Sequence, residues 1–206
     1  MKNTKKILAV ACAMALSAAI AVGGTLAYLT SQDSVTNTFT VGNVKIVLDE
    51  ADTDQDENTA DATISGRDKA NDYKLYPGKE YIKDPTITVA QKDDAYGHNS
   101  DSEDCWLFVK VENGIEGIEA EGATTIAAQM AANGWNALDG VDNVYWHAVA
   151  SAGDEVEVFA SFEIAGDVTN EELAEYAAAE IVVTAYAVQA EGFGSAQDAW
   201  DDSFGA

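Results

Sequence analysis

The sequence predicts an all-β protein, an antiparallel β-sandwich with two or three short inserted helices. Seven or eight segments alternate apolar and polar residues in the manner of half-buried strands. Turns or irregular stretches join neighbouring segments, and the βαβ rhythm of a parallel sheet does not occur. The apolar fraction of 47% is enough for a core and excludes an acidic disordered chain. The alternation alone leaves the sandwich topology open.

The first strands are expected on either side of a long polar loop. Residues 44–48 alternate as a strand does, and residues 51–72, rich in Asp, Asn and Thr, are expected to form a surface loop. A short edge strand is expected around residues 62–64. Residues 81–89 alternate again, and Pro85, which has no N–H, favours an edge or a bulge there.

The clearest strand is expected at residues 105–112. Its apolar side chains alternate between two faces, with Cys105, Leu107, Val109 and Val111 on one and Trp106 and Phe108 on the other. This strand is therefore expected to be covered on both faces. We interpret Cys105 as a buried small hydrophobic residue rather than a nucleophile.

A helix and two more strands follow. Residues 124–133 are rich in alanine and precede Gly134, which predicts a short helix with a C-terminal glycine. Residues 144–149 and 155–164 are expected to be antiparallel strands joined by a turn at 151–154. In the second strand, Phe159 is expected to lie on the face opposite Val156, Val158, Ala160 and Phe162.

The C-terminal part begins with a helix signal. Thr169 and Glu172 form a capping box, which predicts a helix to about residue 179. Residues 181–189 are a strong strand candidate, and residues 195–200 are expected to add one helical turn.

The N-terminus has the layout of a secretory signal peptide at residues 1–27. Three lysines precede an apolar run at residues 7–22, and Thr25 and Ala27 are the small residues before a cleavage that would leave Tyr28 first. The alternative is a transmembrane anchor, but the run is short for a ~20-residue span. The protein is therefore expected to be secreted and to meet the membrane only through the uncleaved signal.

The remainder of the chain is strongly acidic. It holds 8 of the 11 basic residues and all 36 acidic ones, a formal charge of −28. Such a surface repels phosphates and anionic lipids, so nucleic acid is not expected as a partner. Residues 28–206 are long enough for a single domain.

Several stretches resemble one known family. The run GGTLAYLTSQDSVTNTFTVGNVKIVLDE at residues 23–50 is similar to the N-terminus of the TasA/camelysin family, and so, more loosely, are residues 75–78, 83–85, 105–111 and 185–190. The resemblance implies a jelly-roll sandwich, export through a SipW-type signal peptidase in a Gram-positive organism, and a role as a structural subunit of an extracellular biofilm-matrix or cell-surface fibre. The partner would then be the protein itself or a related matrix protein.

Two other functions stay open. The camelysin name implies a surface metalloprotease, but His98 and His147 belong to no HExxH motif, and neither a Gly-x-Ser-x-Gly elbow nor a base near Cys105 occurs. We therefore expect no enzyme activity, no catalytic residue and no cofactor. The other alternative is an accessory or adhesive surface protein that does not polymerise.

One acidic loop is a weak candidate for a cation. Asp52, Asp54 and Asp56 alternate as at the start of a calcium-binding EF-hand loop, but Glu57 and Thr63 stand where glycine and glutamate are needed. A solvated loop is the favoured interpretation, with loosely bound calcium as the alternative.

The segment that cleavage would free is the predicted assembly strand, residues 28–40. It is polar and threonine-rich, with Tyr28, Leu29, Val35 and Phe39 as its anchors. We expect it to pair with an exposed sheet edge of the next subunit. The alternatives are that it is a simple leader or the first strand of its own domain.

Overall fold

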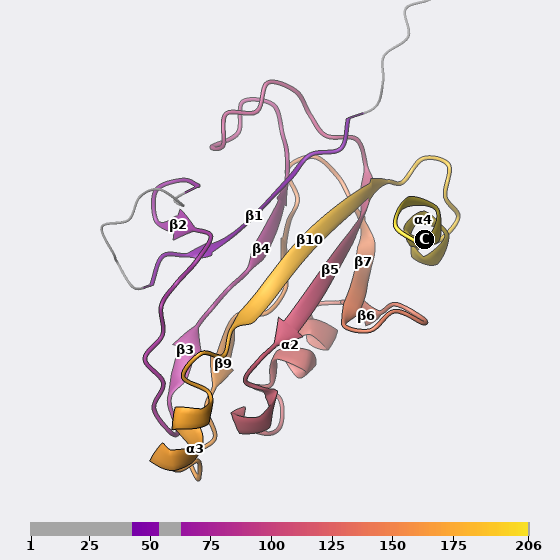
Figure 1. Ribbon diagram of the computed structural model, residues 1–206. Coiled ribbons are helices and arrows are strands. Elements are labelled where there is room, and N and C mark those ends of the chain that lie inside the picture. Colours follow the sequence, from indigo (N-terminus) through magenta and orange to yellow (C-terminus); the bar gives the residue numbers. More distant parts are fainter. Residues whose placement is uncertain (1–42, 54–62, 206) are drawn as a thin grey trace, which may run out of the picture. The chain divides into compact units, whose positions relative to one another are not determined.

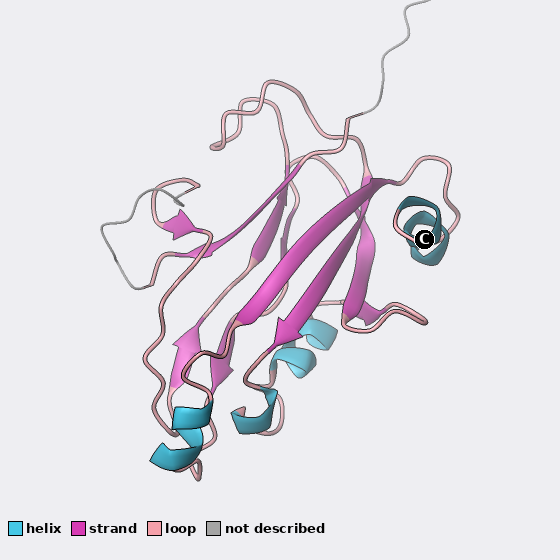
Figure 2. Cartoon of the chain, in the orientation of Figure 1, coloured by secondary structure: helices cyan, strands magenta, loops and turns pink. Residues whose placement is uncertain are grey.

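The structure, a computed structural model, describes residues 43–53 and 63–205 (Figure 1). The predicted signal peptide with Thr25 and Ala27, the assembly strand 28–40 with its four anchors, and Asp54 and Asp56 lie outside these residues. The described part is an all-β protein with short helices, as the sequence predicts, and every strand pairing in it is antiparallel (Figure 2).

Two four-stranded sheets form the body of the molecule. The first sheet has the order β2–β1–β4–β8 and the second has the order β10–β5–β7–β6. A separate two-stranded sheet pairs β3 with β9. The strands are β1 (Ile46–Ala51), β2 (Arg67–Asp68), β3 (Glu80–Ile82), β4 (Thr86–Val89), β5 (Cys105–Asn113), β6 (Asn136–Ala137), β7 (Val144–Ala150), β8 (Glu155–Glu157), β9 (Ser161–Glu163) and β10 (Ile181–Gln189).

The helices are short and lie around the sheets (Figure 1). They are the 3-10 helix η1 (Glu116–Ile118) and the α-helices α2 (Ile126–Ala132), α3 (Asn170–Glu175) and α4 (Ala196–Ser203). Thr169 and Glu172 form the predicted capping box, with both reciprocal hydrogen bonds present. The helix they open ends at Glu175, earlier than residue 179, because the chain turns at Tyr176 to enter β10. Within the described residues, no helix is both long and apolar enough to cross a lipid bilayer.

The main core lies between the two sheets. Ile87 and Val89 of β4 meet Leu107 and Val109 of β5 there, all with no exposed area. A second cluster on the other face of β5 joins Phe108 to α4 through its buried residues. The prediction that residues 105–112 form a strand covered on both faces is confirmed.

Two expectations about residues 144–164 are wrong. β7 pairs with β5 and β8 pairs with β4, so the turn at 151–154 carries the chain from one sheet to the other rather than closing a hairpin. The expected second strand breaks into β8 and β9 around Phe159. The break turns Phe159 into the same core cluster as Val158 and Phe162, so it does not lie on an opposite face.

Three other expected strands differ in extent. The first strand runs to Ala51 rather than residue 48, because β2 pairs with its last two residues. Residues 81–89 form β3 and β4 on either side of Pro85, which agrees with a break at the proline. Around residues 62–64, the described contact is an isolated bridge between Ile64 and Arg67.

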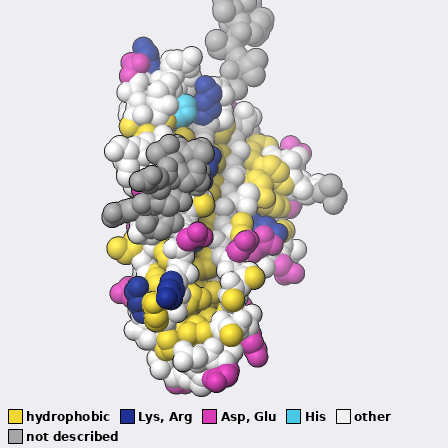
Figure 3. All heavy atoms as spheres, turned by 60° about the vertical axis from the view of Figure 1, so that its left-hand side comes forward, with side chains coloured by type: hydrophobic (Ala, Val, Ile, Leu, Met, Phe, Trp, Pro, Cys, Tyr) yellow, Lys and Arg dark blue, Asp and Glu magenta, His cyan; other side chains and the backbone are white. Residues whose placement is uncertain are grey.

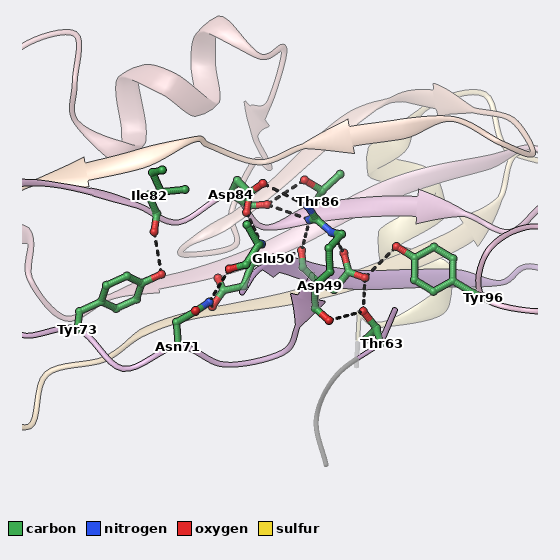
Figure 4. A network of polar contacts seen from close by, with 11 residues as sticks. Asp49, Glu50, Thr63, Asn71, Tyr73, Ile82, Asp84, Thr86 and Tyr96 are labelled. Atoms are coloured by element: carbon green, nitrogen blue, oxygen red, sulfur yellow. Dashed lines mark hydrogen bonds and ion pairs between the residues drawn. The ribbon is translucent and has the colours of Figure 1, made fainter. Parts of the chain in front are cut away.

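A network of buried charges fixes β2 against β1 (Figure 4). Arg67 donates from Nε to Oδ1 of Asp49 at 2.6 Å, and its Nη1 reaches Oδ2 of Asp84 at 3.2 Å. Burial by itself lowers the pKa of Arg67, but hydrogen bonds and charge from both aspartates raise it, so the guanidinium stays charged. Tyr96 and Thr63 donate hydroxyl hydrogen bonds to Oδ2 of Asp49 at 2.8 Å and 2.5 Å.

Glu50, the next residue, has partners of its own. Its Oε2 lies 2.5 Å from Nζ of Lys83, and its Oε1 accepts from Nδ2 of Asn71 at 2.9 Å. The two adjacent carboxylates, Asp49 and Glu50, are therefore neutralised by side chains from outside β1. In the described part of the segment between β1 and β4, these charge pairs act together with the packing of Tyr73, Leu75 and Tyr81 against the main core.

Arg67→Met should lower the free energy of unfolding by about 2–3 kcal/mol, because it leaves the Asp49 carboxylate buried without its cation. The figure is set below that for a fully buried pair because 24% of the Arg67 side chain is exposed. Urea unfolding measures the loss. The matched control is Lys110→Met, which removes the exposed ion pair with Glu112 and should lower the free energy of unfolding by clearly less than Arg67→Met. Equal losses in the two variants would contradict this account of the network.

Candidate assembly edge

The edge strands on the two sides of the sandwich differ in whether their backbone groups have partners. An edge strand exposes a row of backbone N–H and C=O groups that another chain can pair with, unless the protein covers them. On one side the edge of the first sheet is β8, and on the other it is β2, which pairs with only the last two residues of β1 and leaves the rest of β1 at the edge. β1 lies near β10, an edge strand of the second sheet. Within residues 43–53 and 63–205, the β8 side is partly covered, and the outer side of β10 and of residues 46–48 has no strand partner.

Side chains from α2 and the loop after it cover β8. The carbonyl of Glu157 accepts a hydrogen bond from Nε1 of Trp135 at 3.0 Å. Asn133 reaches the carbonyl of Val158 at 3.4 Å, and Gln129 accepts from the amide of Ala160 at 3.0 Å. Trp135 is only 3% exposed, so its ring is buried where it bonds to β8. The Glu157 carbonyl of β8, the Val158 carbonyl and the Ala160 amide therefore have side-chain partners within the domain.

On the open side, β10 presents alternate residues to the edge. Gly114 donates to the Glu180 carbonyl, and Ala190 donates to the Asp104 carbonyl. In an antiparallel ladder the hydrogen-bonded pairs alternate, so the even residues of β10 bond to β5 and the odd ones point their N–H and C=O away from it. The outward residues are Ile181, Val183, Ala185, Ala187 and Gln189. Among the described residues, β5 is the only strand that pairs with β10.

The same reasoning applies to β1. Ala90 donates to the Lys45 carbonyl, so the odd residues from 45 to 49 face β4 and the even ones face away. β2 pairs with Glu50 and Ala51, and Asp52 donates to the Gly66 carbonyl, which closes that end of the edge. Ile46 and Leu48 are left, and within the described part of the chain no strand pairs with their outer side.

The side chains at this edge are incompletely covered. Apart from the exposed Gln189, the outward residues of β10 and β1 pack against the main core but are only half-buried, whereas Ile87, Val89, Leu107 and Val109 of β4 and β5 are fully buried. The half-buried set is Val44, Ile46, Leu48, Ile181, Val183, Ala185 and Ala187. β1 and β10 approach each other, so these side chains border one seam. We call the outward residues of β1 and β10 the β1/β10 edge.

Backbone groups without a partner among the described residues and half-buried apolar side chains thus occur on the same residues. Figure 3 shows hydrophobic side chains along a band on the side of the molecule that is on the left in Figure 1. An extended segment laid along the β1/β10 edge would bond to the backbone and bury apolar area at about 25 cal/mol per Å². The edge is therefore chemically suited to accept a strand.

The structure places the other candidate residues apart from one another. His98, in the acidic loop, lies 2.7 Å from Asp94 through Nδ1, and His147 lies in β7 beside the Trp135 ring. Burial alone would raise the pKa of Asp94, but hydrogen bonds from His98 and Gln91 lower it to about 2. Within residues 43–53 and 63–205, no group of three His, Cys, Asp or Glu side chains is arranged to hold a metal ion.

Cys105 is buried in the core, as the sequence predicts. Burial raises the pKa of its thiol to about 11, with further increases from the charges of Asp104 and Asp154. A thiol with that pKa is a poor nucleophile at neutral pH. Of the three aspartates in the candidate cation loop, only Asp52 lies in the described part, so that site stays a prediction.

The sequence analysis missed the β1/β10 edge. The alternation within residues 181–189 predicts a strand but does not say which strand pairs with it, and edge position depends on that pairing alone. One signal in the sequence pointed to this edge. Ala185 and Ala187 stand at positions whose side chains pack against the core, and alanine covers less of a core than valine or isoleucine.

Protein-family models, curated proteins and solved structures were compared with the chain, and none of the three comparisons finds a match.

Proposed function

We propose that the protein is an exported structural subunit of an extracellular fibre, assembled by strand addition at the β1/β10 edge. The observation that carries the proposal is that two features occur on the same residues: backbone groups with no described partner, and half-buried apolar side chains. The acceptor is the edge of one copy. The donor is residues 28–40 of the next copy, freed by cleavage after Ala27. Export by a SipW-type peptidase and the jelly-roll topology, which the family resemblance implies, belong to this proposal.

The donor sequence suits the acceptor in length and spacing. Thirteen extended residues span about 43 Å, and the nine residues of β10 span about 30 Å. Leu29, Val35 and Phe39 all fall at odd positions, so in an extended strand they share one face. That face would cover the half-buried side chains of the edge. The contact joins different surfaces of two identical copies, so it does not close and propagates into a filament.

Two other functions stay as alternatives to this proposal. A surface metalloprotease would digest casein when the mature protein is loaded with metal. An accessory or adhesive protein would stay monomeric when concentrated. The absence of a described edge partner favours the fibre subunit over both, because an uncovered edge of this length is a hazard for a protein that does not use it.

Deleting residues 28–37 from the mature protein should abolish filaments seen by electron microscopy, because the donor strand is removed. A matched pair of full-length variants separates the anchors from the rest of the segment. Leu29→Ser with Val35→Ser should also prevent assembly, and Thr30→Ser with Thr36→Ser should not. Filaments that grow at the wild-type rate from the deletion variant would exclude residues 28–40 as donor.

Val183→Pro should block assembly while the subunit stays folded. The Val183 N–H points to the β1/β10 edge, so proline removes a donor needed by the incoming strand and no bond of the β5 ladder. Val183→Ala removes side-chain atoms but keeps the N–H and should still assemble. Circular dichroism checks the fold, and electron microscopy scores the filaments. Assembly by the proline variant would show that strand addition occurs elsewhere.

Acid should accelerate assembly between pH 7 and pH 4. Carboxylates with pKa values near 4 gain protons over this range, so the charge of about −28 per mature subunit falls and repulsion between copies weakens. Light scattering follows the growth. The sequence pI is about 4.1, so Val183→Pro is the control that separates filament growth from precipitation. Scattering that stays flat, or that rises equally in the control, would contradict the prediction.

A further inference from the structure

The basic residues of this acidic protein are confined to one part of the chain. No Lys or Arg follows Lys110, and five of the eight beyond Ala27 fall within residues 67–83. Arg67 forms an ion pair with Asp49, and Lys83 forms one with Glu50. Lys74 and Lys79 belong to the same stretch but take part in neither ion pair.

Lys74 and Lys79 are exposed and have no ion pair among the described residues, although acids outnumber bases more than threefold. Their ammonium groups lie over tyrosine rings instead. Nζ of Lys74 is 5.5 Å from the centroid of Tyr76, and Nζ of Lys79 is 5.7 Å from Tyr76 and 4.6 Å from Tyr81. Such contacts hold the two cations in place without neutralising them.

Apolar surface adjoins these cations. Tyr76 is 46% exposed and Ile82, on β3, is 61% exposed, the largest value among the exposed large hydrophobic residues of the described chain. Figure 3 shows lysine and arginine side chains beside hydrophobic ones on the lower part of that face. We call Lys74, Tyr76, Lys79 and Ile82 the basic-aromatic patch. Unpaired cations around exposed apolar side chains suit an anionic partner that also carries apolar groups.

A surface of the opposite kind lies at the C-terminal end of the same chain. An open pocket of about 470 Å³ is lined by Phe193, Asp198, Asp201 and Asp202, on and before α4. Phe204, just after this helix, is 42% exposed. The basic-aromatic patch is beside β3, and α4 packs on the far end of the second sheet, so one copy cannot bring the two surfaces together (Figure 1).

We propose that the basic-aromatic patch of one copy docks on the α4 surface of a second copy. Lys74 and Lys79 would meet the aspartates, and Tyr76 and Ile82 would meet Phe193 and Phe204. Complementary charge selects this occupant, since no basic residue lies in residues 111–206 to oppose the approach. The contact joins two different surfaces and so extends along a row of copies. It uses neither residues 28–40 nor the β1/β10 edge, so it is independent of strand addition.

A charge exchange tests the contact in mature protein carrying Val183→Pro, so that strand addition does not contribute. Asp201 and Asp202 are chosen because both are exposed at the end of α4, where lysine is compatible with the helix dipole. Sedimentation velocity at ~0.15 M salt measures self-association, because the Debye length of about 8 Å there screens the long-range repulsion between copies.

Three variants decide the outcome. Lys74→Glu with Lys79→Glu should weaken self-association at least about tenfold, and Asp201→Lys with Asp202→Lys should do the same. The quadruple variant has the parent's net charge and should associate within about threefold of it. Failure of the quadruple variant to recover, a loss confined to the lysine variant, or a parent that stays monomeric would overturn the proposal. The first two would point to another acidic partner for the patch.

Discussion

The main constraint on this domain is the hydrogen bonding of backbone groups at its sheet edges. Every buried N–H and C=O needs a partner, and the edge strands of a sandwich are where partners run out. On the β8 side the protein supplies them from Gln129, Asn133 and Trp135, so that helix α2 serves as a cover for an edge. No described element does this for β1 and β10. In the chain, α2 follows β5 and the 3-10 helix η1, and its described contacts of this kind are with β8 and the residues just after it.

The buried charges set the limits of the open edge. β2 has two residues and contributes little pairing by itself, and what keeps it against β1 is Arg67 between Asp49 and Asp84. Because β2 covers Glu50 and Ala51, the free length of β1 ends at Leu48. A salt-bridged network also fixes geometry more sharply than apolar contact, since a shift of register would leave a carboxylate buried without its cation. The network therefore holds β2 in place, and β2 limits the unpaired length of β1 in the described structure.

Local signals in the sequence predicted the elements, and long-range pairing escaped them. Residues 105–112 and 181–189 were predictable because each has a continuous alternation, and Thr169 with Glu172 was predictable because a capping box is contained in four residues. The expected pairing of residues 144–149 with 155–164 was wrong because a tight turn suits a crossing between sheets as well as a hairpin. Phe159 was misplaced because the bend beside it interrupts the period of two. Whether a strand lies at an edge depends on which other strands pair with it, and a local sequence pattern does not contain that information.

The negative charge of the protein affects how its unpaired sheet edge can associate with other copies. A nine-residue strand with no described partner on one edge invites edge-to-edge pairing with any copy that approaches. The formal charge of −28 carried by residues 28–206 opposes that approach at long range, where the attraction of a strand for an edge does not yet act. The electrostatic repulsion between two copies is strongest when they meet in random orientations, because the charges of the whole surface then contribute to it. It is weakest where the few unpaired lysines face an acidic neighbour, since there the local sign is reversed. A surface of this kind does not prevent association. It selects the orientations in which association occurs, and those that bring a basic region towards an acidic one are the least opposed.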